Sequence, residues 1–327
     1  MRAAVLGIVI AFISSSLMEN VLGSQESTTY AEEYELYQKA EVETDKAKQR
    51  VLLIQFVTTY KESALDLNIS YLYGLSYAQI RKQRQWEQLA SVAENFLRHR
   101  PNDSASIRAA TEAYQHLGNS HKLIEFGSKL YNDSPSSDIA YLITRAYQSL
   151  NDDINFRKWG QRIIQHDPNN LEVLVELSNS YWGASDFTNS ELYAKQALQV
   201  TEIAKKPDAQ SIREWNAQLD RVRGFCYRAI AETAYTGKNT NKARDNFETS
   251  LRYDDHNDFT YYRLGLIYWG TRRTDEAVIS LAKAVALNGT NVMKAQYELD
   301  RLYISLHGNT KGLRTIIHQA RTELNPR

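Results

Sequence analysis

Few residues of this chain have the types and spacing that catalysis or metal binding requires. Of the seven histidines, His116 and His121 are five residues apart across an expected turn, a poor arrangement for holding a metal from one helix. The run 254–258 contains three aspartates, whose oxygens suit calcium, but it lacks the glycine and the final glutamate of a helix–loop–helix calcium site. We interpret this run as a turn and a helix cap, and we expect no metal site.

Nucleophilic and cofactor chemistry is equally weakly indicated. Cys226, the single cysteine, lies between Phe225 and Tyr227 with no histidine at helical spacing, which is typical of a packed small residue. One thiol excludes an intrachain disulfide, a thiolate zinc site and an iron–sulfur cluster. The sequence contains no phosphate-binding loop, dinucleotide fingerprint, zinc-protease histidine pair or nucleophile elbow. We therefore predict a protein that is not an enzyme and that uses no cofactor.

The composition indicates which elements position the remaining residues. Lysine plus arginine and aspartate plus glutamate both number 39, so the formal net charge is zero, which argues against general nucleic-acid binding. Glycine (14) and proline (5) are both scarce. Because strand-rich folds need many turn residues, this scarcity favours long helices with short connections.

A period of about 34 residues runs through the chain. It is carried by prolines, aromatic residues and small residues: Pro101, Pro135 and Pro168; Tyr114, Tyr147 and Tyr181; Tyr235 and Trp269; Ala243 and Ala277. Such self-similarity predicts a repeat architecture in which each unit packs against its neighbours.

The clearest unit, residues 261–284, has the pattern of two packed helices. One face of the first helix carries Tyr261, Leu264, Gly265 and Tyr268, and one face of the second carries Ala277, Leu281 and Ala284. Gly265 and Ala277 are small, so the two helices can approach closely. The unit resembles the tetratricopeptide repeat. The resemblance extends in degenerate form from near Asn68 to the C-terminus, with other small residues in place of the glycine: Thr111, Thr144, Ser178 and Ala231.

The resemblance implies an all-α fold, a right-handed α-solenoid superhelix of about seven helical hairpins. We expect this array to span residues 67–327, with an insertion at about 200–221. The insertion is expected to lengthen the flanking helices, because Ile212, Trp215 and Leu219 recur at helical spacing. Residues 25–66 are expected to form one further hairpin that caps the N-terminal end.

Residues 1–24 have the pattern of a signal peptide. Arg2 is followed by an apolar run of 11 residues, 3–13, and Gly23 and Ser24 precede a polar stretch. A transmembrane helix needs about 20 apolar residues, whereas a signal-peptide core needs about 7–15. We predict an exported protein, periplasmic or secreted, that does not span the membrane once this segment is removed. No cysteine follows the run, so we do not expect a lipoprotein.

In the tetratricopeptide repeat family the first helices line a concave face that binds partners. The family's groove positions fall in this sequence on Arg108, Glu112, Tyr141, Arg145, Glu176, Asn179, Trp182, Arg228, Glu232, Tyr235, Tyr262, Arg263 and Trp269. This mixture suits an extended peptide, because aromatic rings supply apolar area and arginines grip carboxylates. Asn179 alone does not make the lysine/asparagine set with which some members bind a C-terminal carboxylate. Alternatively, these arginines and glutamates pair with each other across neighbouring helices.

The resulting hypothesis is a non-catalytic scaffold that binds a protein or an extended peptide in a bacterial cell envelope. A glycan- or small-molecule-binding protein would be favoured if Trp182, Tyr262 and Trp269 were exposed and adjacent. An enzyme, or an accessory subunit of an envelope enzyme, would be favoured by a buried pair of groove carboxylates with a raised pKa. The carboxylates concerned are Glu112, Glu176 and Glu232.

Overall fold

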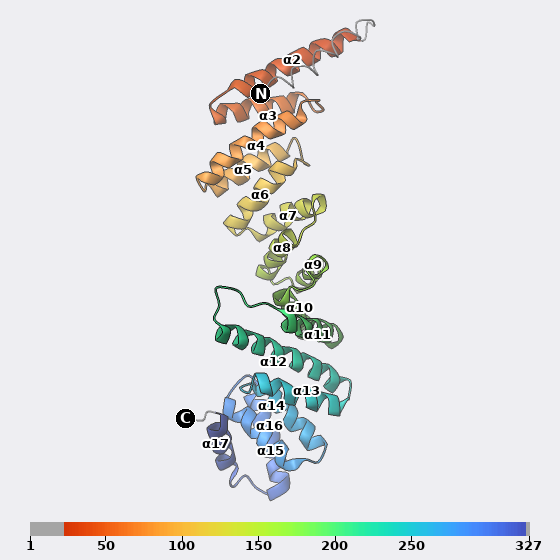
Figure 1. Ribbon diagram of the computed structural model, residues 1–327, viewed down its shortest axis with the longest axis vertical. Coiled ribbons are helices and arrows are strands. Elements are labelled where there is room, and N and C mark those ends of the chain that lie inside the picture. Colours follow the sequence, from red (N-terminus) through yellow and green to blue (C-terminus); the bar gives the residue numbers. More distant parts are fainter. Residues whose placement is uncertain (1–22, 325–327) are drawn as a thin grey trace. The chain divides into compact units, whose positions relative to one another are not determined.

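The prediction of an all-α fold is confirmed. The computed structural model describes residues 23–324, which form sixteen α-helices joined by connections without strands (Figure 1). This number provides for an N-terminal hairpin and seven further ones, as the α-solenoid requires. The predicted signal peptide, residues 1–24, lies outside the described residues except for its last two positions.

The chain divides into two compact units, residues 1–151 and 152–327. The helices of unit 1 are α2 (Gly23–Val42), α3 (Lys46–Thr59), α4 (Asp66–Lys82), α5 (Trp86–Leu97), α6 (Ser104–Leu117), α7 (Ser120–Asp133) and α8 (Ser137–Ser149). Those of unit 2 are α9 (Asp153–His166), α10 (Leu171–Gly183), α11 (Phe187–Ile203), α12 (Ile212–Thr236), α13 (Thr240–Tyr253), α14 (Asp258–Gly270), α15 (Thr274–Leu287), α16 (Val292–His307) and α17 (Leu313–Leu324). The even-numbered helices are the first helices of their hairpins.

Prolines and polar caps set the boundaries between hairpins. Asp103 accepts a hydrogen bond from the backbone N–H of Ser106 at 2.8 Å, and Asn170 accepts one from Val173 at 3.2 Å. Each cap follows a proline of the 34-residue period by two residues. The proline is incompatible with a continuing helix, and the cap then satisfies an amide at the start of the next one, at about 1 kcal/mol per cap.

The core of unit 1 is built from aromatic residues of successive hairpins. Tyr73 of α4 packs its ring against Phe96 of α5, with 4.4 Å between the ring centroids. Tyr77, one turn further along α4, is 1% exposed, and its hydroxyl shares a hydrogen bond of 2.6 Å with the Ser106 hydroxyl of α6. The buried polar groups therefore have partners, as a dry core requires.

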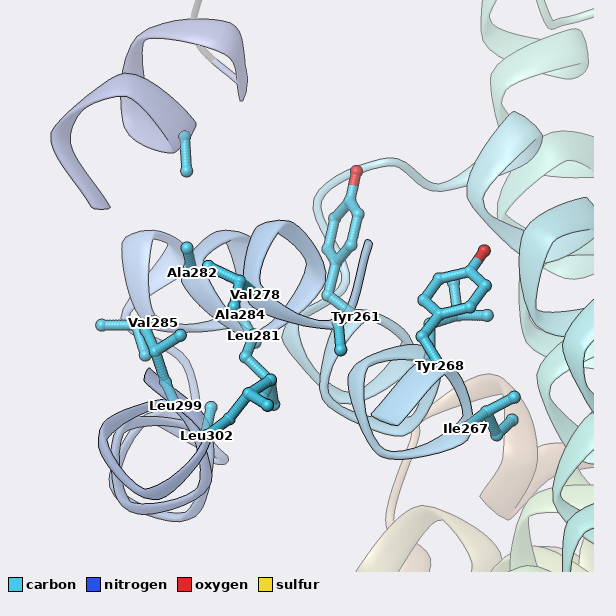
Figure 2. Close-up of a cluster of buried hydrophobic side chains, with 14 of the residues drawn as sticks. Tyr261, Ile267, Tyr268, Val278, Leu281, Ala282, Ala284, Val285, Leu299 and Leu302 are labelled. Atoms are coloured by element: carbon cyan, nitrogen blue, oxygen red, sulfur yellow. The ribbon is translucent and has the colours of Figure 1, made fainter. Parts of the chain in front are cut away.

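In unit 2 the repeat consensus forms the core between α14, α15 and α16. Figure 2 shows Tyr261 and Tyr268 of α14, Leu281 of α15 and Leu299 of α16 in one cluster of buried side chains. The close approach expected at Gly265 is present, because a Cβ added there would lie 2.5 Å from Leu281 Cγ. The small residue is therefore required by packing. The threonines and serine at the equivalent positions are also buried, and their hydroxyls bond to backbone carbonyls.

The inserted residues extend two helices and leave a short segment between them. Helix α11 continues to Ile203, residues 204–211 form the connection, and α12 then runs for 25 residues (Figure 1, green). Ser211 and Glu214 start α12 as a capping box, in which each side chain bonds to the backbone N–H of the other residue. About two thirds of the insertion, residues 200–203 and 211–221, is thus helix or helix cap.

Candidate functional site

The predicted groove residues lie on first helices and fall into two groups, one in each unit. In unit 1, Arg108 and Glu112 lie on α6, and Tyr141 and Arg145 lie on α8. In unit 2, Glu176, Asn179 and Trp182 lie on α10, Arg228, Glu232 and Tyr235 on α12, and Tyr262, Arg263 and Trp269 on α14. The group in unit 2 follows three successive first helices.

Trp182 joins α10 to the next two first helices through its aromatic ring. The ring is half-buried, with its centroid 6.2 Å from that of Phe225 on α12 and 5.5 Å from that of Phe259 on α14. The family positions do not include these two phenylalanines. They precede Arg228 and Arg263 by three and four residues, so helical spacing alone places them on the same helix faces as the predicted residues.

Glu232 of α12 and Arg263 of α14 form an ion pair across neighbouring first helices. Glu232 is 2% exposed. Burial raises the pKa of its carboxyl, and the attraction of Arg263 opposes this rise. The Arg263 guanidinium lies over two rings, 4.7 Å from the centroid of Tyr235 and 5.1 Å from that of Phe259. Carboxylate and rings together fix the position of the arginine.

This pair is also incompletely satisfied. Oε2 of Glu232 and Nε of Arg263 are buried and have no hydrogen-bond partner among the residues that the structure describes. The arrangement corresponds to the alternative in which groove charges pair with each other.

Trp269 continues the aromatic series toward the C-terminal end of unit 2. The guanidinium of Arg301 on α16 lies 5.4 Å from the centroid of Trp269 and 5.5 Å from that of Tyr297. Arg301 is ion-paired with Glu298 at 3.0 Å, and Tyr297 is 62% exposed. The family positions do not include these α16 residues, because the last hairpin lacks the repeat consensus. Tyr262 is half-buried, and burial raises its pKa.

Three other predicted residues of unit 2 differ from one another in their surroundings. Arg228 is half-buried and donates to Asp254 at 2.6 Å, in the connection between α13 and α14. Its charge is therefore already matched within the chain. Asn179 is exposed on α10, and Glu176 is half-buried there.

The predicted residues of unit 1 do not form a comparable aromatic series. Glu112 is ion-paired at 2.5 Å with Arg81 of α4, a residue that the family positions do not include. Arg108 is exposed. The guanidinium of Arg145 lies 4.5 Å from the ring centroid of Tyr141, one turn away on α8.

The contacts in unit 2 connect four first helices into one surface. We call this surface the first-helix face, and its residues are Trp182 (α10), Phe225, Glu232 and Tyr235 (α12), Phe259, Tyr262, Arg263 and Trp269 (α14), and Tyr297 and Arg301 (α16). It combines six half-buried rings and the exposed ring of Tyr297 with arginines that are held over several of them. Such a surface offers apolar area and cationic edges in fixed positions.

Cys226 and the acidic run 254–258 have structural roles in the fold. Cys226 is fully buried, and burial raises the pKa of its thiol to about 12. In the run 254–258, Asn257 caps α14 by accepting from the Thr260 N–H at 3.0 Å, and Asp258 accepts from the Asn291 N–H at 2.6 Å. Between residues 23 and 324 no group of three or more histidine, cysteine or acidic residues is placed to hold a metal ion.

None of the helices that the structure describes is long and apolar enough to cross a membrane.

Known proteins resemble this chain at the level of the repeat. The sequence profile of the tetratricopeptide repeat matches residues 260–291, which include all of α15 and most of α14. No curated protein sequence matches the chain.

Solved structures show a weaker likeness. A crystal structure of MamA is 16% identical, with a TM-score of 0.42, and the match covers 57% of this chain and 91% of that one. PilF of Pseudomonas aeruginosa is 12% identical, with a TM-score of 0.38 and coverages of 66% and 97%. The C-terminal part of a TPR repeat-containing protein from Cytophaga hutchinsonii is 11% identical, with a TM-score of 0.42 and coverages of 77% and 95%.

Proposed function

We propose that this chain, which belongs to the tetratricopeptide repeat proteins, is a non-catalytic scaffold that binds an extended segment of a protein partner on the first-helix face of unit 2. The observation that carries the proposal is the position of Arg263, whose guanidinium lies over the rings of Tyr235 and Phe259 while Glu232 holds it. Aromatic residues and arginine contribute most of the binding energy at protein interfaces. Here they occur together on successive helices.

Preorganisation supports the same function. Side chains that are already packed lose little conformational entropy when a partner arrives, so more of the contact energy appears as affinity. Trp182 is held by Phe225 and Phe259, and Trp269 by Arg301. An extended peptide would lay apolar side chains on these rings, and the exposed amide of Asn179 would bond to its backbone.

A comparison of two variants tests the proposed face. The bait would be the full chain, crosslinked to its partners in native cells, beside a variant with Trp182→Ala and Tyr262→Ala. The matched control is Tyr30→Ala with Tyr71→Ala, which removes two exposed rings of unit 1. We expect the affinity for the captured partner to fall at least tenfold in the first variant and to remain unchanged in the control. Equal binding by both variants would show that the partner binds to another surface.

We further propose that the protein is exported to the cell envelope, on the strength of the apolar run at residues 3–13. Cell fractionation followed by mass measurement of the purified protein tests this location. A cytosolic protein that retains residues 1–24 would contradict it.

A further inference from the structure

Unit 1 contains a cavity of about 480 Å³ between its second helices α3 and α5, with α4 at its base. Its walls come from residues 47–54 of α3 and from residues 91–98, which are the second half of α5 and its C-cap. It therefore lies in a different unit from the first-helix face and is formed by the other helix of each hairpin.

Two arginines face this cavity without a partner. Arg50 of α3 and Arg98, the C-cap of α5, both line it, and no carboxylate is among the lining residues. Neither guanidinium has a hydrogen bond or an ion pair within the part of the chain that the structure describes. By contrast, Arg81, Arg228 and Arg263 each bind a carboxylate of the chain.

The two carboxylates that interact electrostatically with these arginines, Asp45 and Glu94, form hydrogen bonds with other groups. Asp45, whose pKa Arg50 helps to lower, caps α3 by accepting from two backbone N–H groups. Glu94, whose pKa Arg98 helps to lower, binds Lys122 at 3.0 Å and the Tyr114 hydroxyl at 2.9 Å. Neither carboxylate bonds to Arg50 or Arg98, so both guanidinium groups keep their hydrogen-bond donors open to the cavity.

The rest of the lining is largely apolar and well held. Tyr73 is 1% exposed, and its hydroxyl donates to the Val92 carbonyl at 3.0 Å, which fixes the base of the cavity. Val51 is 68% exposed, and Ile54 is half-buried beside it on α3. Val51 and Ile54 thus offer apolar surface beside the two cations, which suits a ligand that carries an apolar group next to an anionic one.

We infer that this cavity binds an acidic segment of a protein partner, with an aspartate or glutamate carboxylate between Arg50 and Arg98 and a neighbouring apolar side chain on Val51 and Ile54. The charge of the site selects the carboxylate, since arginine bonds to carboxylates through paired, charge-assisted hydrogen bonds. The choice of a protein as the source rests on the proposed scaffold function. The site adds a second contact, specific for acidic sequence, to the one that the first-helix face makes.

A random library of 12-residue peptides displayed on phage provides the probe. The full-length protein is compared with an Arg50→Gln, Arg98→Gln variant and with a control variant of equal charge change, Arg84→Gln with Lys61→Gln, both exposed in unit 1. We expect peptides selected by the parent to be enriched in Asp or Glu beside an apolar residue. Their dissociation constants, measured by fluorescence anisotropy, should rise at least tenfold in the first variant and less than twofold in the control.

A charge-reversal variant sharpens the outcome. Arg50→Glu with Arg98→Glu should select peptides rich in lysine and arginine. If the parent shows no enrichment of acidic residues, or if the control loses as much affinity as the Arg50 and Arg98 variant, the inference is wrong. The Trp182 and Tyr262 variant leaves unit 1 untouched, so loss of binding in it alone bears only on the first-helix face.

Discussion

The buried ion pair of unit 2 makes a quantitative prediction. Arg263→Met keeps much of the side-chain volume and removes the charge, so that Glu232, at 2% exposure, becomes a buried carboxylate without a counter-charge. Removing one partner of a buried ion pair costs about 3–5 kcal/mol. Loss of the contacts with Tyr235 and Phe259 adds about 1 kcal/mol. We therefore expect the free energy of unfolding to fall by about 4–6 kcal/mol at pH 8.

The loss should depend on pH in a definite direction. Burial raises the pKa of Glu232 above its ordinary value of 4.5, so the folded state binds this proton more tightly than the unfolded state does. The stability due to the bound proton is fully present below pH 4.5 and is lost as the pH rises through the folded-state pKa. Without Arg263 that pKa is higher still. The deficit of Arg263→Met relative to the parent is thus expected to be larger at pH 8 than at pH 5.

Urea unfolding followed by far-UV circular dichroism measures these differences. The matched control is the double variant Glu232→Leu, Arg263→Met, in which the unpaired charge is gone and two apolar side chains of similar volume face each other. It should lose only about 1 kcal/mol relative to the parent at pH 5. Because it lacks the Glu232 proton, its deficit relative to the parent should become smaller at pH 8, whereas that of Arg263→Met becomes larger. If the double variant is as unstable as Arg263→Met alone, the cost comes from packing, and the electrostatic reasoning is refuted.

Three further predictions concern the fold. Gly265→Ala places a Cβ 2.5 Å from Leu281 Cγ and should lower the free energy of unfolding by about 1–3 kcal/mol, as measured by urea unfolding. Gly270 lies on the same helix, and a Cβ added there would meet no atom within 4 Å, so Gly270→Ala should be neutral or should stabilise by up to about 1 kcal/mol. Because burial raises the pKa of the Cys226 thiol to about 12, the folded protein should resist a disulfide reagent at pH 8 that modifies the urea-unfolded chain at once; rapid modification of the folded chain would contradict the burial. Ser211→Ala removes the capping box of α12 and should cost about 1 kcal/mol, with faster amide exchange in the first turn of α12 alone.

Part of the candidate site follows from local spacing. The repeat period places Trp182, Glu232 and Arg263 on first helices, because positions that share a helix face recur at three and four residues. The same period omits Phe225 and Phe259, which the structure packs against Trp182. These two rings contact Trp182 because three helices approach one another, and the residue pattern of a single helix does not predict that approach.

The tertiary structure also changes the meaning of some predicted residues. Arg228 fits a groove position as well as Arg263 does, yet its guanidinium is taken by Asp254, only 26 residues away in the connection between two helices. Arg81 was outside the predicted set and binds Glu112. Which charges meet depends on the rotation of each helix about its axis and on the separation of the axes. Family positions specify neither quantity.

The amino-acid sequence by itself determined the all-α fold and the repeat. Prolines, polar caps and the apolar stripe of each helix act within a few residues, so they can be recognised in the sequence. Only the tertiary structure decided that Glu232 is buried against Arg263 and that Arg50 and Arg98 stand without partners beside a cavity. Pairing and burial of charge depend on atoms from several helices, because desolvation and Coulomb attraction act through space and take no account of distance along the chain.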